Sequence, residues 1–166
     1  TCDTHNLTNL KGGSVYVIED FFCNRNYITS LEGRPKSVGG DFYCDNNNLT
    51  DLKGSPEEIS NNFNCGGNDI TSLKGCPKKI GRNFDCYNNE LSDIDFIPEW
   101  IGGSVSLDGN TIGSIFDNVD IDFLRSFKSF KVLTDGVINL KRLKYLMGLF
   151  DKFVDLKEIE YNYIIK

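Results

Sequence analysis

The chain has 166 residues, of which 39% are hydrophobic and 25% charged, a composition typical of folded proteins and not of disordered ones. Its apolar stretches are only a few residues long, so none is expected to span a membrane. The formal net charge is −6, and residues 1–115 carry nine Lys or Arg against sixteen Asp or Glu, which disfavours direct nucleic-acid binding and favours a protein partner with a basic surface.

Residues 1–115 repeat with a period of 21 residues. Cysteine recurs at this spacing, an asparagine follows most of these cysteines by three residues, and a Leu or Ile follows by five. The cysteine column contains Cys2, Cys23, Cys44, Cys65 and Cys86, and Leu107 takes its next position. So many columns in one register predict a solenoid in which four full units, with a partial unit at either end, stack on one another.

Each unit is expected to contain one short strand. Segments 41–45 and 83–86 alternate apolar and polar residues, which predicts that Phe42, Cys44, Phe84 and Cys86 point inward. Parallel rungs would then stack like side chains about 4.8 Å apart. The asparagine after each strand is expected to satisfy backbone groups of its own turn and of the neighbouring rung. Gly and Pro in the rest of the unit predict return arms with little or no helix.

The cysteines are open to more than one interpretation. No closely spaced pair of the C-x-x-C type occurs, so no metal or other cofactor is expected. Reduced core thiols in a cytoplasmic protein are favoured over disulfides between neighbouring rungs. Cys76 lies in a return turn and is expected to be exposed. His5 is the only histidine and stands in the asparagine column, so a structural role is favoured, and the chain is predicted not to be an enzyme.

One run of residues carries a family resemblance. Residues 56–73 read PEEISNNFNCGGNDITSL. This run resembles the leucine-rich-type repeats, L-x-G-x-P…G-x-F-x-C-x-x-N-x-L-T-x-L, that are common in proteins encoded by tailed bacteriophages. The resemblance covers essentially the whole chain, including the tail after the last repeat. It implies a phage protein with a solenoid fold, and it says less about what the protein does.

The repeat stops at residue 116, and residues 116–166 are predicted to form a small α+β cap. A helix beginning near Asp120 would bury Phe123, Leu124, Phe127 and Phe130. A hairpin around residues 134–136, a second helix over residues 140–154 and a strand over residues 159–165 are expected to follow. The second helix would bury residues Leu143, Leu146, Met147 and Phe150. The predicted fold is therefore a leucine-rich-repeat-like solenoid with a parallel β-sheet, mostly non-helical return arms and a C-terminal cap.

The outward face of the predicted strands is the candidate binding surface, because solenoids bind mostly through their concave strand face. Its aromatic side chains are of the type that dominates binding hot spots, and its charges are nearly all acidic. The candidate partner-binding residues are Asp20, Phe22, Asn24, Arg25, Asp41, Tyr43, Asp45, Asn64, Asp85, Tyr87 and Asp108, with Asn62 and Asn83 on the same face.

Two hypotheses for the function follow. The first is a monomeric, non-enzymatic module that binds and modulates or inhibits a host protein in the bacterial cytoplasm, such as a defence or nucleic-acid enzyme. The alternative is a structural or virion-assembly accessory protein, which would self-associate or be found in virus particles.

Overall fold

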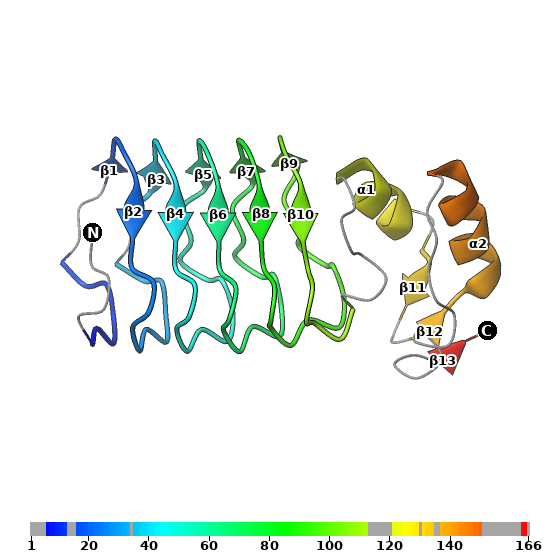
Figure 1. Ribbon diagram of the computed structural model, residues 1–166, viewed down its shortest axis with the longest axis horizontal. Helices are drawn as coiled ribbons and strands as arrows, with labels where there is room; N and C mark the ends of the chain where they lie inside the picture. The colour runs from blue at the N-terminus through cyan, green and yellow to red at the C-terminus, as the bar shows by residue number, and fades with distance from the viewer. Residues whose placement is uncertain are drawn as a thin grey trace.

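The computed structural model describes residues 6–12, 16–33, 35–112, 121–129, 131–134, 137–150 and 164–165. Within residues 16–106, each 21-residue unit forms one rung with two short strands, and Figure 1 shows the rungs side by side in a row. Every strand pairs in parallel with its counterpart one rung away, 21 residues along the chain, as in the pair Phe42 and Phe63. This register stacks each column of the repeat directly on itself. The predicted parallel solenoid is confirmed.

The strands form two parallel sheets on opposite sides of the solenoid (Figure 1). We call them the front sheet and the back sheet. The front sheet contains β2 (Phe21–Phe22), β4 (Phe42–Tyr43), β6 (Phe63–Asn64), β8 (Phe84–Asp85) and β10 (Val105–Ser106). The back sheet contains β1 (Tyr16–Val17), β3 (Ser37–Val38), β5 (Glu58–Ile59), β7 (Lys79–Ile80) and β9 (Trp100–Ile101).

The front sheet corresponds to the strand predicted in each unit, whereas the back sheet lies in the return arm, where only turns were expected. Backbone hydrogen bonding in the front sheet extends beyond the two-residue strands, since the Cys44 amide donates to the Asn64 carbonyl at 2.8 Å. The described return arms contain no helix, as predicted. Each rung is therefore a flattened coil with a strand on either side.

The core between the two sheets consists of stacked identical or similar side chains. The front strands supply the phenylalanine and cysteine columns, and Phe42, Phe63 and Phe84 are fully buried with ring centroids 5.5 and 5.6 Å apart. The back strands supply a Val or Ile column, including Ile59 and Ile80. Because a single rung is too thin to enclose these side chains, their burial depends on the rungs above and below.

The predicted asparagine ladder is confirmed. The amide nitrogen of Asn68 donates to the carbonyl of Cys65 in its own rung at 3.0 Å and to that of Cys44 in the preceding rung at 3.2 Å. Its side-chain oxygen accepts from the Leu49 backbone amide at 3.0 Å. The same pattern recurs at Asn47 and Asn89. One buried amide thus satisfies backbone groups of two rungs at the point where the chain leaves the front sheet.

The C-terminal segment contains α1 (Ile121–Ser129), β11 (Leu133–Thr134), β12 (Val137–Ile138), α2 (Leu140–Leu149) and β13 (Ile164–Ile165). Strands β11 and β12 are antiparallel, and β13 is parallel to β12. The helices bury the predicted residues Phe123, Leu124, Phe127, Leu143, Leu146 and Met147, while Phe150 is half-buried. Neither described helix has the length and hydrophobicity needed to cross a bilayer.

Polar contacts join α1 to the last rungs of the solenoid. The Lys128 ammonium lies 3.6 Å from the Asp95 carboxylate, and the Arg125 guanidinium donates to the backbone carbonyl of Glu99. The buried side chains of α1 belong to the same continuous core as those of the rungs. The segment therefore covers the end of the apolar stack, as expected of a solenoid cap.

One prediction about the cysteines was wrong. Cys76 was expected to be exposed, but it is only half-exposed and packs against the core, and burial raises the pKa of its thiol well above the usual range. All five described cysteines are free thiols. Several other predictions fall outside the described residues: those for Cys2, His5 and Phe130, the tip of the hairpin at residues 135–136, and most of the segment after residue 150.

Candidate interaction face

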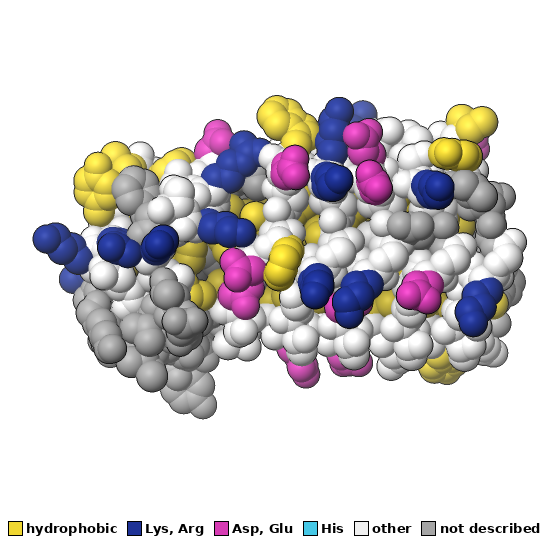
Figure 2. Space-filling model, turned by 180° about the vertical axis from the view of Figure 1, so that it is seen from behind, with side chains coloured by type: hydrophobic (Ala, Val, Ile, Leu, Met, Phe, Trp, Pro, Cys, Tyr) yellow, Lys and Arg dark blue, Asp and Glu magenta, His cyan; other side chains and the backbone are white. Residues whose placement is uncertain are grey.

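The two sheets differ in the charge of their outer faces. The front strands and the positions that flank them hold one cation among five acids, namely Arg25 with Asp20, Asp41, Asp45, Asp85 and Asp108. The corresponding segments of the back sheet hold equal numbers of each sign, namely Lys36, Lys78, Lys79 and Arg82 with Glu19, Glu57, Glu58 and Glu99. Figure 2 shows this back side, with basic and acidic side chains interspersed. Of the two sheets, only the front sheet therefore has an excess of acidic residues at these positions.

The column at the start of the front strands has a structural role that sequence reasoning missed. One oxygen of Asp20 accepts a hydrogen bond from the Asp41 backbone amide at 2.7 Å, and Asp41 accepts in turn from the Asn62 backbone amide at 2.9 Å. Asn62 and Asn83 continue the ladder to Ser104. The signal was a column of short side chains that each carry an acceptor oxygen. These residues hold the rungs together, and Asp20 and Asp41 also leave negative charge at the surface.

The structure contradicts the placement of Asp45 on the exposed face. Its side chain is 7% exposed and accepts a hydrogen bond from the Asn46 amide at 2.7 Å. Arg25 is exposed in the bend after β2 with a φ of 55°, and its backbone amide donates to the Asp45 carbonyl at 3.0 Å. Asn24 is half-buried beside it. Of these three residues, only Asp45 is removed from the accessible surface.

Phe22 and Tyr43 are adjacent on the outer surface of β2 and β4. Their ring centroids lie 5.1 Å apart with the planes inclined at 51°, and both side chains are half-buried instead of exposed as predicted. Burial raises the pKa of the Tyr43 phenol, and the negative charges of Asp41, Asp85 and Asp20 raise it further. Hydrogen bonding with Asp41 also raises this pKa. Tyr43 is therefore a neutral ring surrounded by carboxylates.

Asn64 and Asp85 continue the outer surface beyond Tyr43, on β6 and β8. Asn64 is half-buried, and its side-chain oxygen accepts from the Gly66 backbone amide at 2.9 Å. Asp85 is also half-buried, and this burial raises the pKa of its carboxyl group. Its ionised form is thus held on the face at some cost in solvation.

Tyr87 lies across the neighbouring rung. A Cβ atom built on Gly66 would fall only 2.5 to 2.7 Å from atoms of the Tyr87 ring, so the ring occupies the space above this glycine. Gly66 was not among the predicted residues, although a glycine beside a tyrosine in one column was a visible signal. Because Gly66 has no side chain, the Tyr87 ring can lie over it, two residues along the chain from Asn64.

The structure thus brings together Phe22, Asp41, Tyr43, Asn64, Asp85 and Tyr87 over β2 to β8, and we call this group the aromatic–acidic face. Asp20 lies at its edge. Asp108 lies beyond it on the last rung, exposed, and accepts a hydrogen bond from Ser106 at 3.3 Å. That these residues bind a partner stays a prediction.

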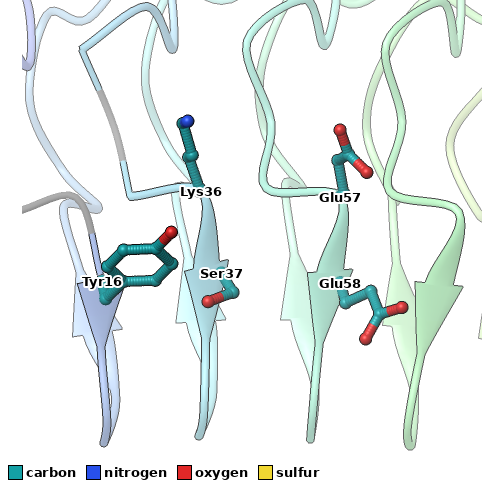
Figure 3. Close-up of a pocket in the computed structure, with 5 residues that line it drawn as sticks. All are labelled: Tyr16, Lys36, Ser37, Glu57 and Glu58. Carbon is teal, nitrogen blue, oxygen red and sulfur yellow. The ribbon is translucent and has the colours of Figure 1, made fainter.

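The back sheet carries a shallow hollow of about 400 Å³. Figure 3 shows its lining residues Tyr16, Lys36, Ser37, Glu57 and Glu58. The Glu58 carboxylate points away from Tyr16, and Glu57 lies 3.9 Å from Lys78. The charged groups of the hollow do not converge on a common point, whereas on the front sheet Asp41, Asp85 and Asp20 all act on the phenol of Tyr43. The front sheet is accordingly the better candidate site.

Comparison with protein-family models, curated proteins and solved structures finds no match to this chain.

Proposed function

We propose that this protein is a non-enzymatic binding module that holds a basic surface of a partner protein on its aromatic–acidic face. The observation that carries this proposal is the charge difference between two sheets built from the same rungs. Stacking requires buried columns on both sides, but it does not require acids on one outer face and balanced charge on the other. The acidic residues of this face complement the charge of a cationic protein surface. Its aromatic rings are of the residue type that contributes most to binding hot spots.

The resemblance to repeats of tailed-phage proteins supports a more specific version of the proposal. In this version the chain is a phage protein in the cytoplasm of a bacterial host, where it modulates or inhibits a host protein. A nucleic-acid enzyme, such as a defence nuclease, is a suitable target because its substrate groove is basic. The acidic face would repel nucleic acid itself.

The test compares two charge reversals that alter the net charge equally. Asp85→Lys changes the aromatic–acidic face, and Glu58→Lys changes an exposed residue of the back sheet as the matched control. Each protein is immobilised and used to capture partners from bacterial lysate. We expect Asp85→Lys to lose a partner that the wild type and Glu58→Lys both retain, and we expect that partner to elute as salt is raised. Equal capture by all three proteins, or a partner indifferent to salt, contradicts the proposal.

A structural or virion-assembly role is the second candidate, and one observation favours it. Around β1 and after β2, Tyr16, Ile18 and Tyr27 are 67%, 90% and 59% exposed. The same columns of the next rung hold the residues Ser37, Gly39 and Asn48. Large exposed apolar side chains favour self-association. Light scattering distinguishes the candidates: the binding module is expected to be a monomer, and the accessory protein an oligomer that Ile18→Asp dissociates.

A further inference from the structure

Within the aromatic–acidic face, the surroundings of Tyr43 differ from the rest of the sheet. Three aromatic rings lie here within four rungs of the carboxylates of Asp41 and Asp85, whereas the outer strand positions of the back sheet pair their one acid, Glu58, with a base, Lys79. We propose that this region takes an arginine side chain of the partner protein, which stacks on Tyr43 and pairs with the carboxylates of Asp41 and Asp85. The inference rests on the proposed function and names the group that the face recognises.

The shape of the region comes from its two ring systems. Phe22 packs against one side of Tyr43 with centroids 5.1 Å apart, so the opposite side of Tyr43 faces Asn64 and β8. Tyr87 lies over Gly66 in the same rung as Asn64. Asn64 therefore lies between Tyr43 and Asp85 along the outer surface, and Tyr87 covers the glycine two residues after Asn64.

The region carries negative charge that the protein leaves unbalanced. Asp41 and Asp85 both act on the Tyr43 phenol, and no ion pair links either of them to a cation within the described part of the chain. Asp41 uses one oxygen for the next rung at 2.9 Å, which fixes the orientation of its carboxylate. Asp85 makes no such structural bond in the described residues and is half-buried. A cation of the partner would stabilise both the fixed carboxylate of Asp41 and the partly desolvated carboxylate of Asp85.

Arginine fits this arrangement better than lysine or a metal ion. A guanidinium group is planar, stacks on aromatic faces and donates in a fork to carboxylates, whereas an ammonium group is a compact and strongly hydrated charge. A metal ion needs several ligands converging at one point, and Asp41 and Asp85 stand two rungs apart. No group of three candidate ligands occurs among the described residues.

The experiment uses two defined probes, an oligoarginine peptide and an oligolysine peptide of equal length, titrated into the whole protein by calorimetry. We expect the unaltered protein to bind oligoarginine more tightly than oligolysine by roughly tenfold, the size of a cation–π contribution at a partly desolvated site. This comparison requires no substitution, so it does not depend on any variant folding.

Three variants then locate the site. Tyr43→Leu keeps an apolar side chain and is expected to remove most of the preference for arginine. Gly66→Ala displaces the Tyr87 ring without changing any charge and is expected to weaken oligoarginine binding severalfold. Asp85→Asn is expected to weaken both peptides, while the back-sheet control Glu58→Gln leaves both unchanged. Circular dichroism verifies that each variant is folded.

The outcomes separate this inference from the proposed function. Equal binding of the two peptides, or an arginine preference that survives Tyr43→Leu, overturns the arginine site and leaves the acidic face intact as a binding surface. If Asp85→Asn and Glu58→Gln weaken the peptides equally, the aromatic–acidic face has no special role and both proposals fail.

Discussion

Phe96 occupies a position that four other rungs give to glycine. Its φ is 64°, and the glycines of the same column, Gly12, Gly33, Gly54 and Gly75, have φ values of 86° to 88°. A bulky side chain in the left-handed region is strained at a cost of about 1–2 kcal/mol. The ring is also 56% exposed, so burial offsets little of that cost. Phe96 therefore lowers the stability of its rung.

Replacing this residue should make the protein more stable. Phe96→Gly relieves the left-handed strain, and after the greater chain entropy of glycine is subtracted we expect the free energy of unfolding to rise by up to about 1 kcal/mol. Urea denaturation followed by circular dichroism measures the change. Phe96→Ala removes the ring but keeps the strain, so it should give no such gain. A gain of equal size in Phe96→Ala would show that the exposed ring, and not the backbone, is responsible.

Asp85 provides a pH-dependent prediction. Burial raises the pKa of Asp85 in the folded protein, so the ionised carboxylate lowers the free energy of unfolding at pH values above that pKa. The penalty vanishes as the pH falls below the value of an unfolded aspartate, about 3.9. We expect Asp85→Asn to be more stable than the wild type at pH 7 and to lose this advantage on acidification. A stability difference that stays constant with pH would contradict the assignment.

At the level of the repeated elements, side-chain amides take the role that backbone pairing has in ordinary sheets. Strands of two residues make few ladder bonds, and the turns between them leave buried backbone groups in need of partners. Asn68 alone serves carbonyls of Cys44, Cys65 and Gly66 and the amide of Leu49. The short strands are stable because the asparagine side chains form hydrogen bonds with backbone groups that strand pairing leaves without a partner.

Removal of one such amide should be costly. Asn68→Ala leaves several buried backbone groups without partners, and we expect the free energy of unfolding to fall by about 3 kcal/mol. Asn48 is exposed in a neighbouring rung, so Asn48→Ala is the matched control and should change stability by less than about 0.5 kcal/mol. Chemical denaturation measures both. Similar losses in the two variants would rule out a special role for the buried column.

Some columns of the repeat could be predicted from the sequence and others could not. Columns with one clear physical role were predictable: the inward Phe42 and Cys44, the asparagine ladder and the apolar faces of both cap helices. The back sheet was not, because a two-residue strand such as Glu58–Ile59 is too short for an alternating pattern. Asp45 could not be told from an exposed position, because aspartate is a common surface residue. Only the fold shows that its side chain is buried.

At the scale of the whole molecule, stacking means that side chains buried in the interior rungs become exposed only when the whole solenoid unfolds. Cys44 and Cys65 are fully buried in the middle of the stack, and burial raises the pKa of both thiols well above the usual range. Neither sulfur is reached by opening a single loop, because each is covered by rungs on both sides. Cys76 lies at a turn and is half-exposed. The thiols therefore report on different levels of structure.

Thiol labelling tests this view of the molecule. With iodoacetamide at pH 8, Cys76 should be modified first, and Cys44 and Cys65 together at the rate of global unfolding. Mass spectrometry of the labelled peptides follows each site. In urea all of the thiols should react at similar rates, which controls for intrinsic reactivity. Modification of Cys44 as fast as Cys76 would show that the stack opens locally.

The asparagine column has a consequence for how such a protein changes length. Each amide bonds only to its own coil and to the one before it, so a duplicated or deleted block of 21 residues meets the same neighbours as the original. Whole units can therefore be gained or lost by recombination without redesign of the interior. The outer residues Tyr43, Asp85 and Tyr87 do not recur in this way, and a change in unit number alters the spacing between them. Unequal crossing-over would thus lengthen or shorten the recognition surface in steps of one unit while leaving the scaffold unchanged.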